Sequence, residues 1–182
     1  MKGMKFKILL LAVLFALLIF IIIFSRSGIS KNNGAVNLYN KGDYAQAAQV
    51  LAEESFKQPE NFSLLNNLAG AQYKNSQMDS ASDEYRSVIS STQASRAEKF
   101  NALYSLGNIE YKKNNFASAI DFYKKALKIN PNDSDAKYNL ENALRQLEKQ
   151  QNQQNQQNQD KQNQQDKQNQ QDKQNQQDKQ NQ

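Results

Sequence analysis

The stretch LGNIEYKKNNFASAIDFYKKALKINP, residues 106–131, decides the fold of this chain. Its apolar and small residues recur every three or four positions, which is the spacing of one buried face of a helix. Asn114-Asn115 interrupts the pattern as a turn, and Pro131 ends it because proline cannot continue a helix interior. The stretch therefore predicts two helices packed as a hairpin, with Gly107 and Ala119 allowing them to approach closely.

The same pattern occurs twice more upstream, in residues 42–61 and 76–91. Corresponding positions are 34 residues apart between the first and second units and 38 apart between the second and third. Five columns align in this way: Ala35, Ala69 and Gly107; Tyr39, Tyr73 and Tyr111; Tyr44, Met78 and Phe116; Ala47, Ala81 and Ala119; Leu51, Tyr85 and Tyr123. Internal periods of this size indicate a stacked array of helical hairpins, an all-α solenoid.

A further helix is expected after Pro131, in residues 134–149, with Asp133 or Ser134 as its cap. Its buried stripe is predicted to be Ala136, Leu140, Ala143, Leu144 and Leu147. The opposite side of this helix is polar, as a stacked array requires of its last element. Three hairpins and a capping helix are about the minimum that buries a continuous core.

The third unit resembles the tetratricopeptide repeat (TPR). Residues 100–133 carry the pattern of that family at Leu103, Leu106, Gly107, Ala119, Tyr123, Ala126 and Pro131. The first unit departs from it at Gly34 and Glu54, and the second has four extra residues within 90–97 and no closing proline. The resemblance implies a TPR solenoid with units at 28–61, 62–99 and 100–133 and a capping helix at 134–149.

The N-terminal segment predicts a membrane anchor. Residues 8–24 form an unbroken apolar run of 17 residues, which spans about 26 Å as a helix. A cleaved signal peptide is the alternative, although its apolar region is usually shorter, about 7–15 residues. Lys2, Lys5 and Lys7 precede the run, so residues 1–7 are expected in the cytoplasm and the repeats outside it. We expect a single-pass inner (cytoplasmic) membrane protein with its TPR domain on the periplasmic or extracytoplasmic side.

The charge distribution argues against nucleic acid as a ligand. The net charge of +5 lies wholly in residues 1–31, whereas residues 32–149 contain 14 basic and 14 acidic residues. A neutral folded part has no excess charge with which to displace counterions from phosphates.

Catalytic motifs are absent from the sequence. The chain has no His and no Cys, and it has no glycine-rich phosphate loop. The adjacent carboxylates Asp83-Glu84 and Glu53-Glu54 point in different directions on a helix and cannot flank one bond. We therefore expect no enzyme, no catalytic residue, no metal, no cofactor and no small-molecule substrate.

The resemblance implies a concave groove lined by the first helix of each unit, which binds a protein partner or an extended peptide. Projected onto this sequence, the groove residues are Asn66, Asn67, Lys74, Tyr104, Ser105, Asn108, Lys112, Tyr138, Asn139 and Asn142, with Asn33 in the first unit. Amides can donate to and accept from a peptide backbone. The other interpretation is that these polar residues only solvate an exposed helix face. Some TPRs grip a terminal carboxylate with paired Lys or Arg and Asn; here only Asn67 matches those positions, so that mode is not expected.

Residues 150–182 contain no apolar residue and repeat DKQNQQ from Asp160 onward. Such a Gln/Asn-rich tail cannot bury a core, so it is predicted to be disordered or only transiently helical. Its role is either a hydrated spacer or a weak self-association segment.

One membrane span, a few TPRs, the sequence DAKYNLENALRQLEKQ and a Gln-rich tail together resemble the small TPR proteins of bacterial aerotolerance (Bat) operons. That resemblance implies a scaffold in an envelope complex whose partners are membrane proteins with von Willebrand A domains. The alternative is an envelope assembly or secretion factor that transiently holds exported chains.

Overall fold

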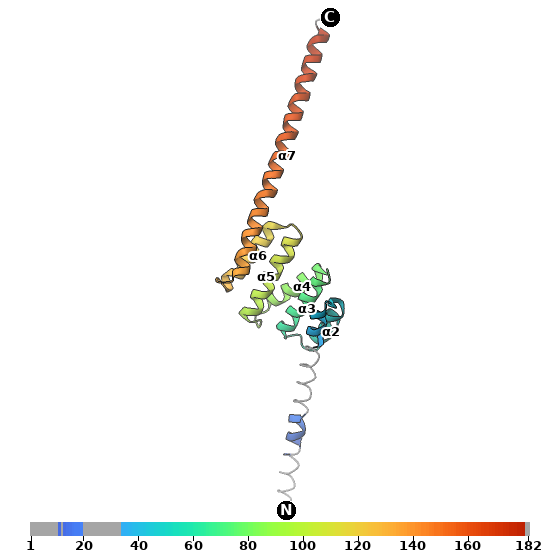
Figure 1. The fold of residues 1–182 in the computed structure, drawn as a ribbon, viewed down its shortest axis with the longest axis vertical. Coiled ribbons are helices and arrows are strands. Elements are labelled where there is room, and N and C mark those ends of the chain that lie inside the picture. The colour runs from blue at the N-terminus through green and yellow to red at the C-terminus, as the bar shows by residue number, and fades with distance from the viewer. Residues whose placement is uncertain (1–10, 12, 20–33, 181–182) are drawn as a thin grey trace, which may run out of the picture.

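The computed structural model describes residues 11, 13–19 and 34–180 of the 182-residue chain. Regular secondary structure in these residues is helical throughout, and the predicted all-α solenoid is confirmed. A helix over residues 34–41 pairs with the first labelled one to form the first hairpin. The labelled helices are α2 (Tyr44–Lys57), α3 (Phe62–Lys74), α4 (Met78–Ser90), α5 (Arg96–Lys112), α6 (Phe116–Ile129) and α7 (Ser134–Gln180). Helices α3 and α4 form the second hairpin, α5 and α6 the third, and α7 extends away from the array (Figure 1).

The turn inside each hairpin has the same backbone geometry. Gly42, Ser76 and Asn114 occupy equivalent positions and have φ angles of 86°, 64° and 60°. In each turn the residue with positive φ donates its N–H to the carbonyl three residues before it, and the next N–H donates five residues back. These two bonds form the Schellman motif, which satisfies carbonyls at the end of the preceding helix. The turn predicted at Asn114-Asn115 is thus confirmed, and it recurs at the corresponding positions of the other two units.

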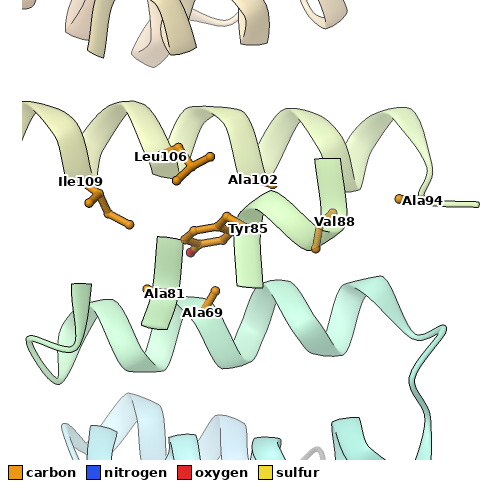
Figure 2. Close-up of a cluster of buried hydrophobic side chains, with 8 residues drawn as sticks. All are labelled: Ala69, Ala81, Tyr85, Val88, Ala94, Ala102, Leu106 and Ile109. Carbon is orange, nitrogen blue, oxygen red and sulfur yellow. The ribbon is translucent and has the colours of Figure 1, made fainter. Parts of the chain in front are cut away.

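The aligned columns of the sequence form the core. Ala47, Ala81 and Ala119 have no exposed surface, and Tyr85 and Tyr123 are buried against them. Figure 2 shows the central cluster, in which Tyr85 and Val88 of α4 lie between Ala69 of α3 and Leu106 of α5. Alanine and glycine at the helix crossings leave room for the larger rings, which is why one unit stacks on the next.

Polar bonds between successive units recur at nearly the repeat spacing. The Ser63 hydroxyl donates to the Glu98 carboxylate at 2.8 Å, and Lys113 pairs with Asp79 at 2.6 Å. These two bonds fix the register between hairpins whose apolar faces are alike. Within the third hairpin, the Arg96 guanidinium donates to the Ile129 carbonyl at 3.1 Å and holds the end of α6 against the start of α5.

The first helix of the third hairpin begins with a capping box before residue 100. Helix α5 starts at Arg96 because Ser95 and Glu98 form a capping box, in which each side chain accepts from the backbone N–H of the other. The four extra residues of the second unit are therefore absorbed partly by the turn before Ser95 and partly by an additional turn of helix.

Helix α7 differs from the prediction in its length and in one residue of its buried face. Asp133 caps it by accepting from the Ala136 N–H at 2.8 Å, and Ala136 and Ala143 are buried as expected. Leu144, which was predicted to be buried, is 46% exposed, because it lies beyond the edge of the stripe that contacts α5 and α6.

The tail predicted to be disordered continues α7 without a break through Gln180. Gln and Lys are good helix formers, and the packed start of α7 supplies the nucleus that an isolated polar segment lacks.

The N-terminal predictions fall mostly on residues that the structure does not describe. The expected cytoplasmic residues 1–7, most of the anchor at 8–24, and Asn33 lie outside the described residues. Residues 11 and 13–19 are helical with exposed side chains. None of the helices in the described part of the chain is both long and apolar enough to cross a bilayer.

Candidate partner-binding groove

The first helices of the hairpins form one continuous inner face, because α3 contacts α5 and α5 contacts α7. Two hollows lie along this face. The first hollow has a volume of about 330 Å³ and is lined by Ala35, Val36, Tyr39, Leu51, Asn66, Asn67 and Gly70. The second hollow has a volume of about 480 Å³ and is lined by Tyr73, Asn108, Tyr111, Lys112, Asn114, Tyr123, Asn139 and Asn142. The inner face therefore has a mainly apolar end and an amide-rich end.

The second hollow is built on a network of four polar side chains from α5, α6 and α7. The Tyr123 hydroxyl donates to Asn108 Oδ1 at 2.8 Å. The Asn139 amide donates to the same oxygen at 3.0 Å and to the Tyr104 hydroxyl at 2.9 Å. Burial, followed by the proximity of Tyr104, raises the pKa of Tyr123, so its hydroxyl stays protonated. The network holds α7 to the third hairpin.

The charge of the second hollow is positive. Lys112 lies over the Tyr73 ring at 5.2 Å, and none of the residues that line this hollow is acidic. An ammonium group that lies over an aromatic ring remains charged, and its side away from the ring can still attract a ligand. The hollow can therefore accept polar groups that carry partial or full negative charge, such as carbonyl oxygens.

Six of the ten predicted groove residues line the hollows. Asn66 and Asn67 lie in the first hollow, and Asn108, Lys112, Asn139 and Asn142 lie in the second. Two of these amides are partly occupied: Asn66 donates to the Glu98 carbonyl at 3.1 Å, and the Asn142 oxygen accepts from Arg145.

The other four predicted residues line neither hollow. Tyr104 is half-buried between Phe100 and Tyr123, and Ser105 shares a hydrogen bond with the Tyr85 hydroxyl. Lys74 and Tyr138 are exposed outside the hollows. Tyr104 and Asn139 are only partly exposed, because they bond to each other across the α5–α7 interface.

Several lining residues were not predicted as groove residues. Tyr39, Tyr73 and Tyr111 form one column of the repeat alignment, and all three line a hollow. Their regular spacing was a usable signal, but it was interpreted only as a mark of the repeat. Val36 carries no such signal, since an apolar residue at helical spacing usually indicates core.

The described residues contain no group of three or more acidic side chains arranged to hold a metal ion. What the inner face offers is amides, tyrosines and a lysine, which are groups for non-covalent binding.

Comparison with known proteins identifies the fold. Residues 33–96 and 100–133 each match a family described as tetratricopeptide repeat, and the two matches together span more than half of the chain. No curated protein sequence matches the chain.

Two solved structures are similar in fold at low sequence identity. The first TPR of Spaghetti (RPAP3) bound to the HSP90 peptide SRMEEVD is 18% identical, with a TM-score of 0.59, covering 66% of this chain and 92% of that one. The first TPR domain of human RPAP3 is 17% identical, with a TM-score of 0.61, covering 69% of this chain and 95% of that one. Identities this low establish the fold alone. The fold is a protein-interaction scaffold and is generally non-enzymatic. The chain belongs to the tetratricopeptide repeat proteins.

Proposed function

We propose that the chain is a membrane-anchored scaffold that binds an extended segment of a protein partner along its inner face. The observation that carries this proposal is the pair of adjacent hollows, one mainly apolar and one rich in amides. A folded partner would present a convex surface, whereas an extended segment can place successive side chains and backbone groups in both hollows.

The peptide-bound RPAP3 structure supports this mode of binding, since its title names a bound HSP90 peptide. The groove of the present chain differs in its chemistry. Of the positions at which some TPRs grip a terminal carboxylate, only Asn67 fits, and Val36 and Ser105 occupy two others. The proposed ligand is therefore an internal segment of a partner chain, not a free carboxyl terminus.

The membrane part of the proposal depends on the apolar run at 8–24 and the lysines before it. A helix there anchors the protein in the inner membrane and leaves the groove on the extracytoplasmic side. A reporter enzyme that is active only after export, fused behind Gln182, is expected to be active. An inactive fusion, or a mature protein that begins near Gly28, would contradict the anchor.

The partner class follows from the resemblance to aerotolerance-operon proteins. We propose a von Willebrand A domain membrane protein of the same envelope complex as the partner. An assembly or secretion factor that holds exported chains is the second candidate, favoured by amides that contact any backbone regardless of sequence.

The deciding experiment is capture from membranes with the tagged full-length protein after mild cross-linking. One stable membrane partner supports the scaffold, and many unfolded clients support the second candidate. The double variant Asn67→Ala and Lys112→Ala removes one exposed group from each hollow and should reduce capture without loss of helicity. The control is Lys125→Ala on α6, where the lysine pairs with Asp121 at 2.7 Å outside both hollows. Equal capture by all three proteins would place binding on another face.

A further inference from the structure

The polar network under the second hollow constrains how its amides face a ligand. Asn108 Oδ1 accepts two hydrogen bonds, one from Tyr123 and one from Asn139, so its lone pairs are occupied. The Asn139 amide nitrogen has two hydrogens and donates both, to Asn108 and to Tyr104. The remaining groups are the Asn108 NH₂ and the Asn139 carbonyl oxygen, and both residues line the hollow.

The direct bond between the two amides makes their remaining groups complementary. The oxygen of one amide must meet the nitrogen of the other, so the unused group is a donor on one residue and an acceptor on the other. If both amides turned over together, the tyrosine hydroxyls would exchange donating and accepting roles and the bonds would remain. The hollow would still offer one donor and one acceptor.

We propose that Asn108 and Asn139 act as a coupled pair that recognises the N–H and C=O of one residue in an extended partner segment, and that Tyr123 and Tyr104 are its positioning residues. A residue in extended backbone points its own N–H and C=O to the same side, which matches the pair, whereas a carboxylate offers only acceptors. This inference rests on the proposed function and specifies its ligand class at the second hollow.

One substitution tests the outward donor and leaves the inward bonds intact. In Asn108→Asp both side-chain oxygens accept, so the bonds from Tyr123 and Asn139 are retained while the outward NH₂ becomes an acceptor. The pair then presents two acceptors to a peptide group. Affinity for a peptide is expected to fall about tenfold or more, because a hydrogen bond is lost and a peptide carbonyl meets an oxygen.

The probe is a peptide selected from a random displayed library on the full-length protein, then synthesised with a fluorescent label and measured by anisotropy. Each backbone amide is replaced in turn by an ester, which removes one N–H. At one position, or at two adjacent positions, the ester should weaken the binding of the peptide to the wild type about fivefold. At the same position the ester should not weaken binding to Asn108→Asp any further, because that variant has already lost the interaction. If Asn108 had only a structural role, the ester and the substitution would weaken binding independently. Effects that do not add therefore indicate that Asn108 recognises the peptide backbone.

Two further variants complete the test. Asn132→Asp places the same charge in the exposed turn before α7 and should bind as the wild type does. Tyr123→Phe keeps the ring and removes the hydroxyl, and is expected to weaken binding about twofold to threefold through the same ester position. This variant decides the question if Asn108→Asp does not fold.

The inference would be overturned if Asn108→Asp bound the peptide with unchanged affinity, or if at every position the effects of the ester and of the substitution simply added. The proposed function would then still stand. If the wild type selects no peptide and captures no partner, both are overturned.

Discussion

The ring of Tyr123 occupies the space that a side chain at Gly107 would need. A Cβ built on Gly107 would lie 2.6 Å from Cδ1 and 3.0 Å from Cζ of that ring. The same tyrosine donates its hydroxyl to Asn108, so one residue sets both the closeness of α5 to α6 and the position of an amide in the groove.

Gly107→Ala should therefore destabilise the array by about 1–3 kcal/mol, because Tyr123 is buried and cannot move aside. The matched control is Gly70→Ala, where a Cβ would lie 3.7 Å from the Tyr85 hydroxyl in ordinary contact. That substitution should stabilise α3 by about 0.5–1 kcal/mol, since alanine is the better helix former. Urea unfolding followed by circular dichroism measures the stability of both variants. If both substitutions changed the stability in the same direction, the close contact between Gly107 and Tyr123 would not explain the effect.

Ser76→Gly should raise stability. Ser76 has a φ of 64°, a conformation that is unfavourable by about 1 kcal/mol for residues with a Cβ. Glycine at this position relieves the strain in the Schellman turn, as Gly42 already does in the first unit. The gain expected in thermal unfolding is about 0.5–1 kcal/mol. The neighbouring variant Gln77→Gly, at φ −88°, should instead lose stability. If Ser76→Gly lowered the stability, the Ser76 hydroxyl would contribute more to stability than the relief of backbone strain does.

Glu98→Gln should remove a pH-dependent part of the stability. Hydrogen bonds from the Ser95 backbone and from the hydroxyls of Ser63 and Ser95 hold the pKa of Glu98 below its ordinary value of 4.5. A depressed pKa means that the ionised group stabilises the fold above pH 4.5 and that this contribution is lost as pH falls through the folded-state pKa. The free energy of unfolding of the wild type should exceed that of the variant by about 0.5 kcal/mol at neutral pH, and the difference should be smaller below pH 4.5.

Unfolding curves at several pH values measure the difference. Glu60→Gln, in the exposed α2–α3 turn, is the control and should change little. If the difference in unfolding free energy between the wild type and Glu98→Gln is the same in acid, the effect comes from the packing of the side chain and not from its charge.

Deleting residues 150–182 should reduce the helical signal and leave the unfolding midpoint of the array nearly unchanged. Residues 151–159 are exposed, so no core surface is lost with them. Circular dichroism at 222 nm, compared at equal molar protein concentration and followed on heating, measures both quantities. A lower midpoint would mean that the segment supports the repeats, and an unchanged total helical signal would mean that it is not helical in solution.

The sequence was sufficient for the hairpins because each unit repeats the same small and large residues. Ala47, Ala81 and Ala119 face the same kind of neighbour in every unit, and a spacing of 34 or 38 residues makes that visible without a structure. The early start of α5 was also readable, since Ser95 and Glu98 have capping-box spacing.

The groove was less predictable, because pairings across units have no local signature. Nothing near Asn139 in the sequence indicates that its amide bonds to Tyr104 and Asn108, which lie 35 and 31 residues away. Glu54 differs, because its bond to Lys57 lies within one helix. It stands where alanine is usual, yet it is buried and accepts from Lys57 at 3.1 Å, so a polar residue is tolerated in the core of the first unit.

The length of α7 has a mechanical consequence. Asn139 of the groove and the Gln/Asn-rich segment belong to one uninterrupted helix, which ends at Gln180. The helix from Asn139 to its end is about 60 Å long at 1.5 Å per residue, so a tilt of about 5° at the groove moves the tip by about 5 Å. A helix of this length therefore has the geometry of a lever, in which a small change of angle at the groove becomes a larger displacement at the far end.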